Sequence, residues 1–489
     1  MTRTGIAPRR NGKMKDRRFV YHGMFWVMVV VFLIPALSSA QLLVVQERGT
    51  GIEPLGAPGV ESVLTNVSAG GDSLKASIQA AMDSNPKFLS QKHAYSISHD
   101  AYRESYGALL PQLDFMARGG YGLRRNDTTI AREADGQGDE WSDEQRLVLS
   151  QLLFDGGLTR SRVEADKLYS ESKKEELFNT AEDVGLSATQ YFLDVIRARG
   201  LVELCVRNIE EHEKLLDLTR IRQDSGGGTQ ADVTQAEAAL QEARSRLIQA
   251  NQALDDAVAG YARFFGDKPG VLSMPEPPLL AIPQSEAIAI SMARDGNRAL
   301  KAARLAVQQK ELEIKSAKGV YMPKLHAKVT AARSDNTGGY EASYHDASAM
   351  LEMNFNLYRG GSDAASIRKS KNEKLRAEQD ALDIERQVEE DVRTAYSFYK
   401  ATGKLLPVLR NLTNENAQVV SSYTDQFRMG QRTLVDLVSA QKSLFSSQQV
   451  FLNGMTAHSF SYYRLCMPVS QLMSALGVDL KVKDLGEAK

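Results

Sequence analysis

The sequence has few cysteines and tryptophans, almost no net charge and few long apolar runs. Its 489 residues include 2 Cys and 2 Trp, and the formal net charge is −1. A nucleic-acid binder is expected to carry a basic domain, so this balance argues against a nucleic-acid partner. Each membrane-spanning helix needs ~20 mostly apolar residues, so a mean hydropathy of −0.33 excludes a bundle of such helices. The averages are those of a folded, water-compatible protein.

The first 40 residues differ from these averages. A basic start that holds seven Arg or Lys and one Asp is followed by the apolar run 24–37 (MFWVMVVVFLIPAL) and by Ser38-Ser39-Ala40. This order is typical of a secretory signal peptide, with cleavage expected after Ala40. A retained membrane anchor is the alternative, but the run is shorter than the ~20 residues that span a bilayer.

The two cysteines, Cys205 and Cys466, belong to a chain that is expected to reach an oxidising compartment. They could pair in a disulfide. We prefer the reading in which they are two buried small side chains, because Cys205 falls on the apolar seam of a long predicted helix.

The mature chain contains an internal duplication. Asn85 and Pro111 recur 212 residues later, and a set of later landmarks recurs 204 residues later, which places an eight-residue deletion in one loop. The landmarks are Gly156, Gly157, Gly226, Thr229, Asp232, Ala236 and Leu240, and their counterparts are Gly360, Gly361, Gly430, Thr433, Asp436, Ala440 and Leu444.

These landmarks predict the domain organisation. The two repeats cover residues 73–266 and 285–477, separated by a proline-rich linker over 267–284 that is expected to be extended. The signal peptide of residues 1–40 is followed by an N-terminal extension over 41–72, and a polar C-terminal tail covers 478–489.

Each repeat contains a sustained apolar pattern with alternating steps of four and three residues. In the first repeat it begins at Leu177 and continues to Leu216, and it resumes from Val233 to Tyr261. Such a seven-residue repeat predicts helices packed as coiled coils. The helix between Gly157 and Gly226 would be ~100 Å long, and shorter helices are predicted over 73–110 and 229–265.

Other stretches alternate with period two, as a strand with one apolar and one polar face requires. They lie at 113–123, at 146–154, where the alternation is clean only to Leu149, and at 325–331 and 351–357. The polar segment 125–145 is predicted to be a long loop. Four strands are too few for a membrane barrel, and a bilayer excludes open sheet edges. Several chains must therefore contribute strands to one shared barrel. Two soluble hairpins that cap a coiled-coil rod are the alternative.

In these features the sequence resembles the TolC family of outer-membrane efflux proteins. The resemblance covers residues 73–477 in order and in duplicate. The residues that carry it are Asn85-Pro86, Leu110-Pro111, Phe154-Asp155-Gly156-Gly157, Tyr191, Gly226-Gly227-Gly228-Thr229, Gly430-Gln431-Arg432-Thr433, Phe265-Gly266 and Leu476-Gly477.

The resemblance implies a mainly α protein with a β-barrel part. Three copies would form a 12-stranded barrel in the outer membrane, in contact with its lipid, and an α-helical coiled-coil tunnel in the periplasm. It also implies docking to a periplasmic adaptor and to an inner-membrane transporter, either ABC-type or proton-driven. The chain would be the exit duct of a tripartite efflux or type I secretion system. A periplasmic coiled-coil scaffold without a channel is the alternative function.

The resemblance also suggests roles for residues at two turns. The adaptor-docking tip would comprise Gly226, Gly227, Gly228, Thr229, Gly430 and Thr433. Asp436, held by Arg432, would narrow the tunnel entrance. The family's second aspartate, three residues further on, is replaced by Ser439, so the usual double acidic ring is in doubt.

Both turns also fit a purely structural reading. Thr229 with Asp232, and Thr433 with Asp436, have the spacing of a helix capping box. We expect Asp232 to act as a cap, whereas Asp436 can combine capping with a role at the entrance.

Enzymatic chemistry has little support in the sequence. We find no P-loop, no G-x-S-x-G and no H-E-x-x-H motif, and the seven histidines have no metal-ligand spacing. His212 lies on the apolar seam of the long helix, but the segment Glu210–Glu213 (EEHE) that contains it is predicted to be a solvated helix edge. We expect no cofactor and no metal.

Overall fold

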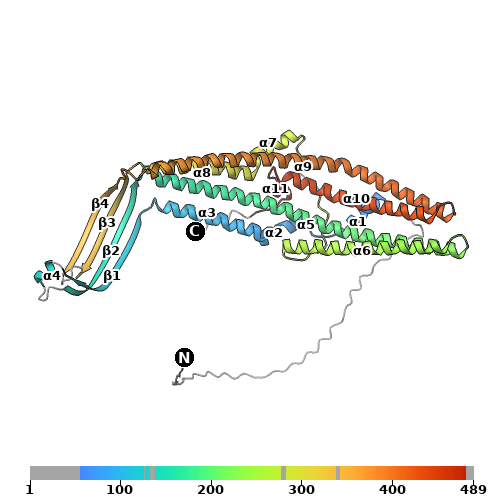
Figure 1. Cartoon of the computed structure of the whole chain (residues 1–489), viewed down its shortest axis with the longest axis horizontal. Coiled ribbons are helices and arrows are strands. Elements are labelled where there is room, and N and C mark those ends of the chain that lie inside the picture. The colour runs from blue at the N-terminus through green and yellow to red at the C-terminus, as the bar shows by residue number, and fades with distance from the viewer. Residues whose placement is uncertain (1–55, 126, 133–137, 277–281, 337–341, 481–489) are drawn as a thin grey trace, which may run out of the picture. The chain divides into compact units, whose positions relative to one another are not determined.

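The structure is a computed structural model that describes residues 56–125, 127–132, 138–276, 282–336 and 342–480 (Figure 1). Two successive series of elements make up the fold. The first series is α1 (Ala57–Ser68), α2 (Leu74–Ser84), α3 (Pro86–Gly107), β1 (Gln112–Arg124), α4 (Asp127–Arg132), β2 (Gly138–Phe154), α5 (Leu158–Asp224) and α6 (Gln230–Phe265). The second is α7 (Glu286–Gly296), α8 (Arg298–Gly319), β3 (Lys324–Asp335), β4 (Ser343–Asn354), α9 (Ser362–Arg428), α10 (Leu434–Cys466) and α11 (Leu472–Leu476).

The two longest helices confirm the prediction made from the seven-residue repeat. Helices α5 and α9 have 67 residues each. Each begins after a glycine in the left-handed conformation, Gly157 with φ 80° and Gly361 with φ 81°, where a side chain would be strained. Each then runs beside the shorter helix that follows it, α6 or α10 (Figure 1).

The single helix predicted over 73–110 is wrong, because it is broken at Asn85. The Asn85 backbone is extended (ψ 121°), and its side-chain oxygen accepts hydrogen bonds from Lys87 N at 3.0 Å and Phe88 N at 3.4 Å. Proline disfavours helical geometry in the residue before it, so Pro86 starts a new helix. Asn297 makes the same break between α7 and α8, with Leu300 N as its partner at 3.0 Å.

The four strands form one antiparallel sheet in the order β1-β2-β3-β4 (Figure 1). The loop predicted over 125–145 is wrong, because α4 lies inside it and β2 begins at Gly138. Strand β1 pairs with β2 along the whole length of β1, from Gln112↔Ser150 to Arg124↔Gly138. The predicted strand over 351–357 is likewise shifted, since β4 is Ser343–Asn354.

The register separates an apolar face of the sheet from a polar one. Leu113 and Phe115 lie opposite Leu149 and Leu147, and all four are well exposed in the single chain. The other face carries charge pairs, among them Arg118 with Glu144 at 3.8 Å. No helix in the described part of the chain is both long and apolar enough to cross a membrane.

The helices enclose two main hydrophobic cores. One joins α1, α2, α3, α5, α6, α9, α10 and α11 around Phe192 and Phe451, which are fully buried. The other joins α5, α6, α9 and α10 close to the two helical turns, around Leu437 and Val420. The extension predicted over 41–72 therefore contains a packed helix, α1, which the sequence reading did not identify.

Both cysteines are free thiols, so the disulfide alternative is not observed between them. Cys205 is buried, as predicted, whereas Cys466 is only half-buried. Burial raises the pKa of each thiol to about 11, which keeps both protonated and poorly reactive at neutral pH.

Candidate functional site

Two helical turns form the candidate site. The first connects α5 to α6, with Gly226 at φ 78°, and the second connects α9 to α10, with Gly430 also at φ 78°. A positive φ at the residue after a helix ends the helix with little strain only when that residue is glycine. The two turns therefore reverse the chain in the same way, although they lie 204 residues apart.

Threonine caps the helix after each turn. Thr229 and Asp232 form a complete capping box at the start of α6, with Asp232 Oδ2 accepting from Thr229 N at 2.9 Å. These hydrogen bonds to Thr229 lower the pKa of Asp232. Thr433 caps α10, since its hydroxyl accepts from Asp436 N at 3.2 Å. Such a cap contributes ~1 kcal/mol to helix stability.

Arg432 is held by groups of its own hairpin. Its guanidinium lies 4.1 Å from the centre of the Tyr423 ring, and its Nε donates to Gln426 Oε1 at 2.9 Å. Its Nη1 lies 3.8 Å from Asp436 Oδ2, and both side chains are partly exposed. The structure thus brings Arg432 and Asp436 together, as one anchored cation beside one solvent-accessible carboxylate.

Ser439 lies one helical turn beyond Asp436 and is exposed. Residues three apart in a helix share a face, so Ser439 presents a hydroxyl where a second carboxylate would double the charge. Of these two positions on this face of α10, only Asp436 therefore carries an acidic group.

Arg222 links the two turns, and the sequence reading did not identify it. Its Nη1 donates to the Phe427 carbonyl oxygen at 2.8 Å, and its Nε donates to the Gly227 carbonyl oxygen at 2.9 Å. The guanidinium also lies 4.7 Å from the centre of the Phe427 ring. One side chain of α5 thus ties the first turn to the end of α9.

A small cavity of about 270 Å³ lies between the turns. Its lining residues are Thr219, Arg222, Gly228, Asp232, Phe427, Gly430, Gln431, Arg432, Thr433 and Leu434. The lining combines two guanidinium groups with one carboxylate and backbone from both turns. Four of the eight residues predicted for the docking tip and the entrance therefore line this one cavity: Gly228, Gly430, Arg432 and Thr433.

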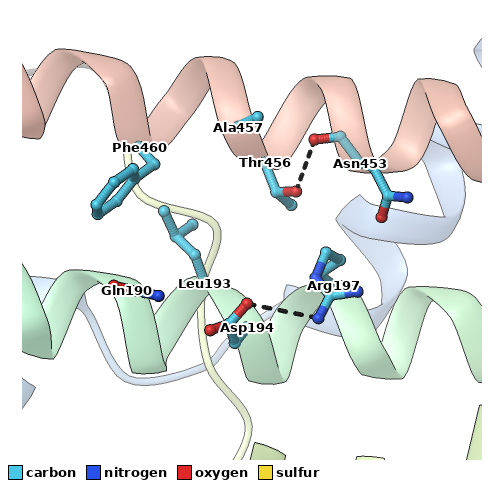
Figure 2. A pocket seen from close by; sticks show the side chains of 8 residues that line it. All are labelled: Gln190, Leu193, Asp194, Arg197, Asn453, Thr456, Ala457 and Phe460. Carbon is cyan, nitrogen blue, oxygen red and sulfur yellow. Dashed lines mark hydrogen bonds and ion pairs between the residues drawn. The ribbon is translucent and has the colours of Figure 1, made fainter. Parts of the chain in front are cut away.

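A second hollow, of about 440 Å³, lies between α5 and α10 away from the turns (Figure 2). Its lining residues are Gln190, Leu193, Asp194, Arg197, Asn453, Thr456, Ala457 and Phe460. Asp194 and Arg197 pair with each other at 3.5 Å, as Figure 2 shows. This lining mixes apolar side chains with one paired acid and base, and it offers no cluster of titratable groups for chemistry.

The prediction for His212 is wrong. The side chain is 2% exposed and lies at the interface of α5 with α6 and α10, not at a solvated edge. Burial, together with the nearby cations Arg246 and Lys442, lowers its pKa to about 4, although Glu242 opposes this effect. Among the residues that the structure describes, its Nδ1 has no hydrogen-bond partner.

No group of three or more His, Cys, Asp or Glu side chains is arranged to hold a metal ion within the described ranges. The two turns form a polar, charged surface at the ends of α5, α6, α9 and α10. Such a surface can bind a protein partner or set the charge of an opening.

Comparison with solved structures defines the class of fold. The outer-membrane channel CmeC of Campylobacter jejuni matches with a TM-score of 0.72 at 12% identity, over 89% of this chain and 92% of that one. The outer-membrane protein VceC of Vibrio cholerae matches with a TM-score of 0.69 at 15% identity, over 83% of this chain and 97% of that one. The fold is that of the outer-membrane channels, a helical tunnel continued by a barrel part.

Sequence comparison identifies the family. The model of the outer membrane efflux protein family matches residues 77–266 and 289–457. The efflux protein BepC of Brucella suis is 26% identical over 390 residues, which cover 79% of this chain and 83% of BepC. TolC of Vibrio cholerae is 23% identical over 410 residues, which cover 81% of this chain and 89% of TolC. The chain belongs to the outer membrane efflux protein family.

Family membership gives the function and the location. The protein is an exit duct through which substrates cross the outer membrane, and its long helices continue the duct into the periplasm. The family is one of channels rather than enzymes.

Proposed function

We propose that three copies of this chain close a 12-stranded barrel and a helical tunnel. The observation that carries this proposal is the sheet, in which β1 and β4 are the outermost strands. A bilayer does not tolerate open sheet edges, and small barrels have about eight strands or more. The β4 edge of one copy would pair with the β1 edge of the next.

The order of the helices supports the same closure. Helices α3, α5, α8 and α9 contact one another in this order, and α6, α5, α10 and α9 do so closer to the turns. Helix α9 is thus the last member of both rows. It exposes large apolar side chains, which would be covered by the next copy: Leu375, Leu382, Leu405, Val408, Leu412 and Val419.

The oligomer is tested on protein extracted from outer-membrane fractions in detergent. We expect a heat-modifiable trimer. A water-soluble monomer would contradict the duct and would favour the coiled-coil scaffold.

Residues 1–40 would be absent from the mature protein as a cleaved signal peptide, and N-terminal sequencing that begins at Gln41 would support this.

We further propose that Asp436 narrows the tunnel entrance and that Arg432 positions it. The carboxylate is partly exposed, and the cation beside it is itself anchored on Tyr423. With threefold symmetry, three such carboxylates would form a single acidic ring. Ser439 contributes no second ring, so we expect weaker inhibition by divalent cations than two rings would give.

The matched pair Asp436→Ala and Asp232→Ala tests the entrance. Both residues occupy the same capping position, one in each repeat. We expect Asp436→Ala to raise single-channel conductance in planar bilayers and Asp232→Ala to leave it unchanged. Equal conductance in the wild type and both variants would refute the role of Asp436.

The turns would also receive the periplasmic adaptor of an ABC-type or proton-driven inner-membrane transporter. The proposed docking tip comprises Gly226, Gly227, Gly228, Thr229, Gly430 and Thr433. A Cβ added at Gly227 would lie 3.4 Å from Arg222 Cγ, an ordinary contact, whereas at Gly228 it would lie 3.2 Å from Gln223 N, so Gly227 is the better position for a large side chain. We expect Gly227→Trp to abolish adaptor binding while trimers and conductance persist. Unchanged binding would place the docking surface elsewhere.

A further inference from the structure

Helix α1 contacts both halves of the duplicated chain. It packs against α5 of the first repeat and against α9 and α10 of the second. Val60 and Val63 are fully buried, and Leu64 is 5% exposed. These side chains belong to the same core as Phe451 and Leu452 of α10. Helix α1 is therefore a packed part of the fold and not a loose extension.

The contact with α5 and α10 is close because position 200 is glycine. A Cβ at Gly200 would lie 3.2 Å from Leu64 Cδ2 and 3.0 Å from Leu452 Cδ1. The absence of a side chain there lets Leu64 fill the space between the two helices.

The contact with α9 comes from the start of α1. Glu61 Oε1 accepts from Arg410 Nη2 at 2.5 Å. A Cβ built on Gly56 would lie 3.8 Å from Ala417 Cβ and 3.0 Å from Asn414 Oδ1. Helix α1 thus reaches α9 at two successive turns of that helix.

These contacts lie between the middle of the helices and the turns. From Ala417 to Met429, α9 extends another ~18 Å at 1.5 Å per residue. Within that length the hairpin α9–α10 packs on α5–α6 through the core around Leu437, and Arg222 bonds to Phe427. For the second turn to move away from the first, the hairpin α9–α10 must tilt away from α5, and the contacts of α1 oppose this tilt.

We propose that α1 is a clasp that holds the hairpin α9–α10 against α5, and that its release widens the tunnel entrance. This rests on the proposed function, in which Asp436 lies at that entrance. The clasp predicts that conductance depends on residues 57–68, which lie outside both turns.

A reversible disulfide provides the first test. The double variant Gly56→Cys with Ala417→Cys would place two Cβ atoms ~3.8 Å apart, the usual separation in a disulfide. Gly56 has φ −71°, which any residue adopts. We expect the oxidised protein to conduct less than the wild type, and a reductant to restore wild-type conductance. The variant Gly56→Cys alone is the control and should not respond to the reductant.

Weakening the clasp provides the opposite test. Val60→Ser combined with Val63→Ser should raise single-channel conductance or open probability by about twofold or more, because it shifts the population toward the released arrangement. The control, Asn66→Ser on the exposed face of α1, should behave as the wild type. If the serine variant forms no trimer, the disulfide decides alone, because it compares one protein in two redox states.

The outcomes separate the clasp from the channel. Conductance that is the same in the oxidised and the reduced protein, while Asp436→Ala still raises it, would overturn the clasp alone. The absence of any current from wild-type trimers would overturn the proposed duct, and the clasp with it.

Discussion

Two buried ionisable side chains predict a compensated pH dependence of stability. Glu182 of α5 is 5% exposed and accepts a hydrogen bond from Leu472 N at 2.9 Å. Burial raises its pKa from 4.5 to about 7, an effect that the backbone hydrogen bonds and Arg298 only partly offset. His212, further along the same helix, has its pKa lowered from 6.5 to about 4.

The two groups change the stability in opposite directions as pH rises. Between pH 4.5 and 7, the folded state keeps the Glu182 proton that the unfolded state has lost, so stability falls as pH rises. Between pH 4 and 6.5, the unfolded state protonates the histidine that the folded state keeps neutral, so stability rises with pH. Each slope is ~1.4 kcal/mol per pH unit, and each group accounts for roughly 3 kcal/mol over its full range.

In the wild type the two slopes cancel between pH 4.5 and 6.5. Glu182→Gln should therefore make the protein more stable as pH rises over this window, and His212→Asn should make it less stable. Over two pH units each change in the free energy of unfolding is roughly 3 kcal/mol, or on the order of 3 °C in melting temperature for a chain of this size.

Melting of the detergent-purified protein at pH 4.5, 5.5 and 6.5, followed by far-ultraviolet circular dichroism, measures these slopes. Glu171→Gln, at an exposed position of the same helix, is the control and should keep the wild-type slope. If Glu182→Gln and His212→Asn both keep the wild-type slope, the two groups do not titrate as their burial requires.

The remaining predictions concern turns and caps. Gly156→Ala should lower the yield of folded protein far more than Gly157→Ala, because both glycines have a positive φ but only at Gly156 would the new Cβ collide, 2.3 Å from Met322 Cβ. The difference should be ~1–3 kcal/mol in denaturant unfolding, and equal effects would contradict the collision. Thr433→Ala should destabilise the start of α10 by ~1 kcal/mol, measured as faster hydrogen exchange there, and Thr433→Ser should restore wild-type exchange.

The sequence predicted the parts of the fold that repeat a pattern along the chain. Helix α5 ends within two residues of the glycines that were taken as its limits, because 67 residues of regular spacing outweigh local exceptions. The first part of β2 was missed because Asp143 and Gln145 interrupt the apolar alternation. They nevertheless pair with Gly119 and Ala117.

Features that depend on distant residues could not be predicted in this way. Arg222 bonds to a carbonyl oxygen 205 residues away, and no local pattern indicates such a contact. At His212 the acidic neighbours favoured solvent, but the heptad position determined its burial. Helix α1 was not predicted because it is short: its apolar periodicity covers only two or three turns.

The equal lengths of α5 and α9 have a consequence for how such a chain can change. One inserted residue in either helix would rotate everything beyond it by ~100° and advance it by 1.5 Å, which would turn Arg222 away from Phe427 and place the two turns at different levels. The stretch from Pro111 to Gly156, which holds the first two strands and their loop, is eight residues longer than the stretch from Pro323 to Gly360, whereas both long helices have 67 residues. The strand regions can therefore change length independently in each repeat. The two long helices can change length only together.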